Sequence, residues 1–354
     1  MSRFNLFSRR FRFPWLRRSF LPLALIAALA VMSACGKPQA ALVNDKINVV
    51  TSFYPLYDFA SKIGGTHVNA VNVVPAGVEP HDWSPKGRDI QNIKNSQVFV
   101  YLGAGFEGWV NDTLESLKTD SKSLVVEAGK GVELIEGTGD AHNHEGEAAH
   151  QEEEAHADEA AHKEEAGHDE AAHEEEAHDE HAVDPHVWLS PLNAKKIAEN
   201  IKNALVQADA AHQADYEANY KKLAADLDAL HQEFKTKLAA VPKKEIVVTH
   251  QSFGYLAKEY GLVQKPIMGL APDAEPTSKD LQSVLKFIKD NDVKYIFFEE
   301  LVSDKLAKTL AQDAGVQTAV LSPLEGLTEE QVQAGDDYVK VMKNNLNSLV
   351  KALQ

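Results

Sequence analysis

Three histidines, each next to an apolar or proline-containing segment, are the residues of this chain best suited to metal chemistry. His81 lies in Gly-Val-Glu-Pro-His-Asp-Trp, His186 lies in Asp-Pro-His-Val-Trp-Leu, and His250 closes the run Ile-Val-Val-Thr-His. Imidazole is the commonest metal ligand among side chains, and three imidazoles with one carboxylate would complete a tetrahedral zinc shell. No two of the three are close in the sequence, so spacing alone does not establish a site.

The segments around these histidines alternate between strand and helix patterns. Short, Val-rich runs predict buried strands, and the helical runs between them predict a parallel sheet covered by helices. Ser303 is the expected N-cap of one helix and Gly315 its C-terminal stop. The expected strands are 47–53, 67–74, 97–102, 123–127, 245–249, 263–269, 295–298 and 317–321. The expected helices are 57–63, 87–95, 107–117, 254–260, 278–291, 304–314 and 336–353.

The stretch from Asn193 to Leu238 separates the two sets of strands and contains neither glycine nor proline. It predicts a long connecting helix, in which the pattern leaves room for a break. Two α/β halves joined by this helix are therefore expected. Because open α/β sheets bind ligands at the carboxyl ends of their strands, such halves could bring His81 and His186 toward His250 and Glu325 across a cleft.

The first 34 residues are expected to be a lipoprotein signal peptide. Six arginines precede an uncharged stretch at 19–34, which is shorter than the roughly 20 apolar residues of a spanning helix. The sequence Met-Ser-Ala-Cys-Gly at 32–36 resembles a bacterial lipobox. It predicts cleavage before Cys35, the only cysteine, and a lipid anchor on its sulfur that holds the protein at the membrane. Residues 35–46 are read as a polar tether.

The segment 140–182 is acidic, rich in histidine and expected to be disordered. Seventeen acidic residues against one lysine give it −16 of the chain's net charge of −17, whereas the rest offers no basic footprint for nucleic acid. It is either a solvated linker or, as we favour, a flexible collector with several weak zinc sites. Its histidines are His142, His144, His150, His156, His162, His168, His173, His178 and His181.

Four ordered motifs resemble those of the metal-binding lipoproteins that feed zinc and manganese ABC importers. They are Glu-Pro-His-Asp-Trp-Ser-Pro (79–85), Asp-Pro-His-Val-Trp-Leu-Ser-Pro (184–191), Thr-His-Gln-Ser-Phe-Gly-Tyr-Leu (249–256) and Ser-Pro-Leu-Glu-Gly-Leu (322–327). The Glu-Glu pair at 299–300 and the segment 337–346 also match, so the resemblance covers the mature chain apart from the histidine-rich segment. It implies an α/β fold of two Rossmann-like (β/α)4 lobes with metal in the cleft between them. The lobes would be 47–191 and 241–354, joined by one rigid backbone helix at 192–240.

The resemblance also implies a ligand set: His81, His186, His250 and Glu325. Glu299 is the alternative to Glu325, because it too ends a predicted strand. Three imidazoles and one carboxylate favour zinc, because manganese prefers carboxylates and water. Manganese-directed relatives commonly carry a second carboxylate at the position of His250. The side chains expected to orient or shield the ligands, rather than bind metal, are Asp82, Asp184 and Trp188.

The expected function is that of an extracytoplasmic, lipid-anchored, monomeric protein with one tight Zn²⁺ site, which delivers zinc to an ABC permease and its ATPase. No catalysis is expected, since the chain has neither a His-Glu-x-x-His helix nor a serine nucleophile elbow. The alternatives are a manganese-binding transporter protein or adhesin lipoprotein, and a secreted zinc metallohydrolase in which Glu325 is a general base.

Overall fold

The computed structural model describes residues 41–119, 121–137 and 183–354. The expected signal peptide, Cys35 and all nine histidines of the acidic segment lie outside these residues. Residues Leu42–Gln354 form one compact unit. Among the helices that the structure describes, none is both long and apolar enough to cross a membrane.

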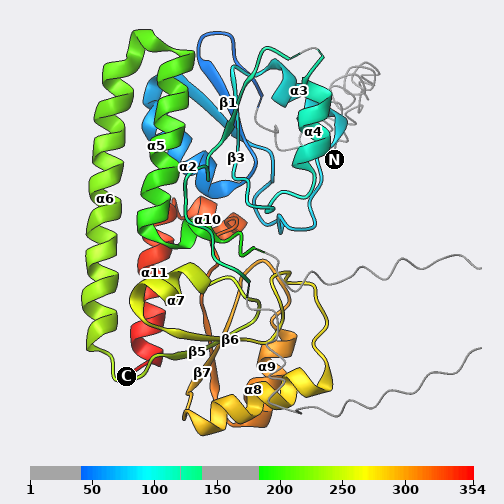
Figure 1. Ribbon diagram of the computed structural model, residues 1–354, viewed down its shortest axis with the longest axis vertical. Helices are drawn as coiled ribbons and strands as arrows, with labels where there is room; N and C mark the ends of the chain where they lie inside the picture. The colour runs from blue at the N-terminus through cyan, green and yellow to red at the C-terminus, as the bar shows by residue number, and fades with distance from the viewer. Residues whose placement is uncertain (1–40, 120, 138–182) are drawn as a thin grey trace, which may run out of the picture. The chain divides into compact units, whose positions relative to one another are not determined.

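Two four-stranded parallel sheets form the framework of this unit, and both have the same topology (Figure 1). The order is β2-β1-β3-β4 in the first sheet and β6-β5-β7-β8 in the second. All ladders are parallel, so each strand is followed by a crossover, and the carboxyl ends of neighbouring strands lie at one edge. The strands are β1 (Ile47–Thr51), β2 (Val68–Asn72), β3 (Val98–Tyr101), β4 (Leu124–Glu127), β5 (Glu245–Val248), β6 (Val263–Pro266), β7 (Tyr295–Phe298) and β8 (Gln317–Val320).

Helices cover both faces of each sheet, because successive side chains of a strand point to opposite faces and both kinds of position are apolar. Val49, Val98 and Val100 pack in the central core with α2, while Val50 and Phe99 pack in a separate cluster with α3 and α4. The second sheet is similarly covered by α7 and α11 on one side and by α8 and α9 on the other (Figure 1). These helices are α2 (Tyr54–Gly64), α3 (Gly87–Asn95), α4 (Val110–Leu117), α7 (Gly254–Tyr260), α8 (Ser278–Asp290), α9 (Lys305–Ala314) and α11 (Tyr338–Ala352).

The connecting stretch is helical as expected, but it is divided into two helices. α5 (Pro191–Ala208) and α6 (Gln213–Ala240) lie side by side and are separated by the short 3-10 turn Ala210–His212 (Figure 1). The break falls at Asp209, whose φ of −148° and ψ of 74° are not helical. α6 packs against α2 of the first half and against α7 and α11 of the second. Its 28 residues, at 1.5 Å each, make it about 42 Å long. Because α6 contacts both halves, it is the backbone helix that joins them.

The fold class predicted from the sequence is confirmed, with small corrections at the element ends. Gly315 ends α9 in the left-handed conformation, with φ of 69°, as expected. The prediction of Ser303 as N-cap is wrong: the N-cap is Asp304, and no side chain caps this helix. The short helix α10 (Glu329–Gln333), with its Thr328–Gln331 capping box, was not predicted.

Candidate metal centre

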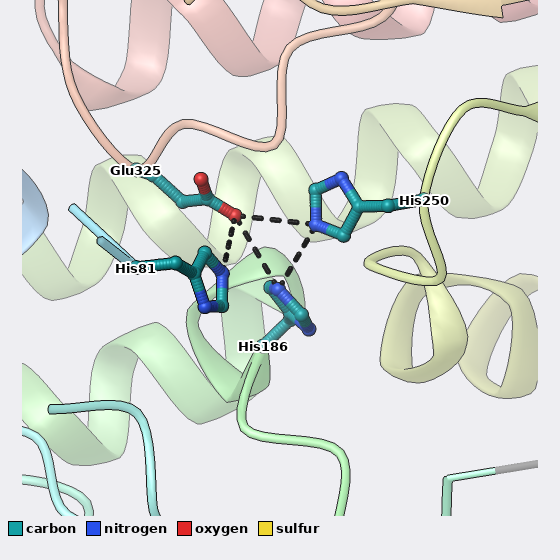
Figure 2. A group of neighbouring side chains, drawn as sticks. All are labelled: His81, His186, His250 and Glu325. Atoms are coloured by element: carbon teal, nitrogen blue, oxygen red, sulfur yellow. Dashed lines mark hydrogen bonds and ion pairs between the residues drawn. The ribbon is translucent and has the colours of Figure 1, made fainter. Parts of the chain in front are cut away.

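Four loops from distant parts of the sequence bring His81, His186, His250 and Glu325 together (Figure 2). Each offers one ligand atom, and these atoms all lie within 4.8 Å of one another. His81 comes from the segment between β2 and α3, and His186 directly precedes the 3-10 turn Val187–Leu189 that leads into α5. His250 and Glu325 follow β5 and β8, at the carboxyl ends of strands of the second sheet. The predicted cluster therefore exists as a spatial group.

The distances within the cluster fit a tetrahedral zinc ion. Glu325 Oε1 lies 3.4 Å from His81 Nε2, 3.3 Å from His186 Nε2 and 3.4 Å from His250 Nε2. The Nε2 atoms of His186 and His250 are 3.2 Å apart. Donor atoms that each lie about 2.0–2.1 Å from a tetrahedral zinc are about 3.3 Å from one another. Four of the six distances between the ligand atoms thus match the edge length of a zinc tetrahedron, and all six are within 4.8 Å.

The cluster is buried and leaves polar atoms without hydrogen-bond partners. His186 and His250 are fully buried, Glu325 is nearly so, and the His81 side chain keeps 15% of its surface exposed. His81 Nε2 and Glu325 Oε1 are both buried and have no hydrogen bond. Buried polar atoms are rarely left unpaired in native proteins, so a cation between them would satisfy both.

Carboxylates behind two of the histidines fix the direction of their rings. Asp184 Oδ1 lies 2.9 Å from His186 Nδ1, and Glu299 Oε1 lies 2.6 Å from His250 Nδ1. An Nδ1–H that donates to a carboxylate leaves Nε2 free as a metal ligand and raises its basicity. Glu299, the alternative ligand, therefore lies on the far side of His250 from the other three side chains. It holds the His250 ring in place, as Asp184 holds the ring of His186.

These charges also set the pKa values of the cluster. Burial opposes protonation of both inner histidines, but the neighbouring carboxylates outweigh it. Asp184 and Glu325 raise the pKa of His186, and Glu299 and Glu325 raise the pKa of His250 to about 10. Burial would raise the pKa of Glu325, yet the three histidines close to its carboxylate hold it well below its usual range. Protons and a cation therefore compete for the same nitrogens.

Aromatic rings form the wall of the cluster on the side of the first sheet. Trp188 is fully buried, its ring centroid is 5.3 Å from that of His186, and its Nε1 donates to Pro323 O at 2.8 Å. Phe106 packs edge-on against His81, with centroids 5.0 Å apart, and also against Trp188. Trp188 thus packs beside His186, the position expected of a shielding side chain, whereas the contact of Phe106 with His81 was not foreseen.

Asp82 does not have the orienting role expected for it. Its side chain is exposed, and its backbone N–H donates to Glu79 Oε2 at 3.2 Å. Glu79 also accepts from the backbone N–H of His81 at 3.0 Å. Burial raises the pKa of Glu79 to about 6. Glu79, two residues before the histidine, therefore shapes this turn.

A cavity of about 470 Å³ reaches the cluster beside His81. Among the four clustered residues, His81 alone lines it. The other lining residues come from both halves: Ala104, Gly105, Leu134, Val183, Pro185, Leu270 and Ala271. The cluster therefore opens, on the side of His81, to a cavity lined by small and apolar side chains.

Two parallel-sheet halves, a connecting helix that packs on both, and a buried His₃-carboxylate cluster define a class of metal-binding α/β proteins. Residues 49–352 match the family described as zinc-uptake complex component A, periplasmic (ZnuA). The chain belongs to this family.

Three relatives show how far the similarity extends. The chain is 39% identical over 333 residues to the high-affinity zinc uptake system protein ZnuA of Bacillus subtilis, covering 93% of this chain and 96% of that protein. It is 40% identical over 329 residues to the zinc-binding protein AdcA of Streptococcus pyogenes, covering 92% of this chain but 60% of AdcA. The crystal structure of the Zn(II)-bound ZnuA-like domain of Streptococcus pneumoniae AdcA superposes with a TM-score of 0.68 at 33% identity, covering 87% of this chain and 99% of that domain.

Proposed function

We propose that this protein captures Zn²⁺ outside the cytoplasm with His81, His186, His250 and Glu325, and delivers it to an ABC importer. The observation that carries the proposal is the convergence of four donor atoms within 4.8 Å of one another, with four of their six distances at 3.2–3.4 Å, the edge length of a zinc tetrahedron. Membership of the zinc-uptake family and the zinc-binding names of its relatives support the choice of cargo.

Ligand chemistry supports zinc over manganese. Imidazole suits zinc, whereas manganese prefers carboxylate and water oxygens. The cluster holds three imidazoles and one carboxylate, and the next carboxylate, Glu299, bonds the far nitrogen of His250. The four donors are therefore those of a zinc site.

The geometry supports a carrier rather than a metallohydrolase. Catalytic zinc sites combine three protein ligands with an open position for water or substrate. Here Glu325 Oε1 lies within 3.4 Å of a nitrogen of each histidine, which is the place of a fourth ligand rather than of a base acting on a bound water. A closed shell of four protein ligands suits capture and transfer.

The remaining parts of the proposal concern the lipid anchor, the two lobes and the acidic segment. A lipid on Cys35 would hold the mature protein, a monomer, at the membrane beside the permease and ATPase that it serves. The two lobes, 47–191 and 241–354, would supply two ligands each. The acidic segment would add weak zinc sites, with imidazole and carboxylate in local excess.

Zinc uptake into cells tests this proposal, with a matched pair of histidine variants. We expect cells that depend on this protein to take up zinc at limiting concentrations, and His186→Ala to abolish this uptake. His231→Ala is the control, because His231 lies on α6 next to Glu259 and Tyr260, away from the cluster. Equal uptake by cells that carry either variant would contradict the proposal.

A further inference from the structure

The hydroxyl of Tyr255 lies where the ligand-bearing loops of the two halves meet. Tyr255 is in the first turn of α7, five residues after His250, and its side chain is almost fully buried. Its hydroxyl donates to Asp184 O at 2.8 Å and accepts from the backbone N–H of Ile135 at 3.1 Å. One hydroxyl from the second half thus joins two backbone segments of the first.

Those two segments, which contain Ile135 and Asp184, flank residues 138–182 in the sequence. Asp184 N donates to Ile135 O at 3.0 Å, and Glu136 and Val183 form an antiparallel bridge. Asp184 then directs His186 twice, since its Oδ1 accepts from the backbone N–H of His186 and lies 2.9 Å from Nδ1. A continuous set of hydrogen bonds therefore runs from Tyr255 through Asp184 to the His186 ring.

Gly254, the residue before Tyr255, allows the start of α7 to lie close to Asp184 and Ile135. A Cβ on Gly254 would lie 2.4 Å from Asp184 Oδ2 and 3.0 Å from the side chain of Ile135, so only glycine lets α7 approach Asp184 this closely. The residues Gly254 and Tyr255 directly follow the His250 loop. Their contact with Asp184 consequently fixes the His250 loop against the His186 loop.

We infer that Tyr255 is a positioning residue, which sets the separation of the His186 and His250 nitrogens through its hydrogen bonds to Asp184 and Ile135. This inference rests on the proposed zinc site, because it concerns two of the proposed ligands. It adds a residue that touches no ligand atom but joins the two halves behind the cluster. His81 lies outside this connection.

Tyr255→Phe tests the inference, because it removes the hydroxyl and keeps the ring. We expect zinc affinity, measured by chelator competition with less than one equivalent of metal on the full mature chain, to fall about fivefold or more. The visible absorption of bound Co²⁺, which reports ligand geometry, should change as well. A variant that lost only general stability would not change this spectrum at temperatures far below unfolding.

Tyr260→Phe is the matched control. Tyr260 is on the same helix, is also largely buried, and has its hydroxyl 3.1 Å from His231 Nδ1 rather than near the cluster. Its zinc affinity should stay within about twofold of the wild type, with an unchanged Co²⁺ spectrum. Identical affinities and spectra for the two variants would overturn the inference.

A second pair of variants probes the same contact by adding volume. Gly254→Ala should displace Asp184 and weaken zinc binding, whereas Gly87→Ala should not. Gly87 also begins a helix, and nothing lies within 4 Å of the position of its Cβ. Equal zinc binding by these two variants would also overturn the inference. If the wild-type protein does not bind one equivalent of zinc tightly, the proposed function itself fails. If the wild type binds zinc tightly and Tyr255→Phe binds it equally well, only the role of Tyr255 fails.

Discussion

The loop that carries His81 and the loops that carry His186 and His250 hold their imidazoles in different ways. His186 and His250 are fully buried, and each has a carboxylate on Nδ1, from Asp184 and Glu299. No such carboxylate is found on the His81 ring among the described residues, and that ring is partly exposed at the 470 Å³ cavity. The site therefore combines two oriented histidines with one that faces its entrance.

This difference separates two tasks of a capture protein. A ligand oriented by a buried carboxylate is ready for the ion before it arrives, which gives affinity. A histidine at the entrance would be the first to bind an arriving ion and the first to release a departing one. Its movement would disturb the buried core less than movement of His186 or His250. The two kinds of histidine should therefore respond differently to substitution.

The largest effect should follow from removal of an inner histidine. We expect His250→Ala to weaken zinc binding more than 100-fold, beyond the roughly 10–100-fold cost of losing a supporting partner. It also leaves the buried Glu299 carboxylate without its imidazole, so the metal-free protein should lose stability. Thermal unfolding and chelator competition measure both quantities. His81→Ala should weaken binding with little loss of metal-free stability, and the reverse order of stabilities would contradict the comparison.

Removal of the carboxylate behind His250 should cost less than removal of His250 itself. Glu299→Gln keeps the shape of the side chain but weakens its hold on Nδ1, and we expect zinc affinity to fall about 10–100-fold. Glu300→Gln is the matched control, because Glu300 accepts from Gln331 at 3.1 Å on α10. If Glu299→Gln lost binding as completely as His250→Ala, Glu299 would be a ligand rather than an orienting residue.

Zinc affinity should fall as the pH is lowered, and this fall should begin at a pH well above 7. The raised pKa values of His186 and His250, the latter to about 10, mean that zinc displaces protons from these nitrogens at neutral pH. Each displaced proton lowers the affinity about tenfold per pH unit of acidification. Calorimetry in buffers of different ionisation enthalpy counts these protons, and equal affinity at pH 6 and pH 8.5 would contradict histidine ligation.

The metal-free protein should show the opposite trend in stability. A histidine whose pKa is higher in the folded state than its ordinary 6.5 stabilises the fold fully below pH 6.5, and this contribution is lost as the pH rises toward 10. The free energy of unfolding of the metal-free wild type should therefore decline between these values. His250→Ala should show a smaller decline over the same range, which denaturant titrations would reveal.

The smallest effect on the tight site should come from deletion of residues 138–182. The flanking segments are already joined by the Glu136–Val183 bridge and by Tyr255, so a short replacement loop should close without strain, and loop length alters closure only weakly. We expect a tight zinc affinity within about twofold of the wild type and fewer weakly bound ions. Unchanged total stoichiometry would contradict the collector role of this segment.

The sequence predicted the fold well because its signals are local. Val-rich strands, the helical stretch between the halves and Gly315 each depend on neighbouring residues, and they appear within a few residues of their expected places. The break at Asp209 was left open, since its flanks have the same composition as the helices. α10 was missed because five residues carry too little periodicity to recognise.

The site was predictable in its members but only in part in its supports: Asp184 and Trp188 were expected, whereas Tyr255 and the place of Glu299 behind His250 were not. Motifs pointed to His81, His186, His250 and Glu325, and the structure brings the four together. The positions of Glu299 and Tyr255 relative to the cluster depend on contacts between residues that are 49 and 71 positions apart from their partners His250 and Asp184. No pattern within one segment carries that information. The Phe-Gly-Tyr run after His250 gave a partial signal, because glycine permits the close approach of another chain segment.

A structure of the zinc-loaded protein, with anomalous scattering recorded at the zinc edge, tests the central claim most directly. One strong peak should lie among His81 Nε2, His186 Nε2, His250 Nε2 and a Glu325 oxygen, about 2.0–2.1 Å from the nitrogens. Asp184 and Glu299 should remain on the Nδ1 atoms of their histidines. A peak that is bound by Glu299 in place of Glu325, or that lies away from these four side chains, would contradict the account.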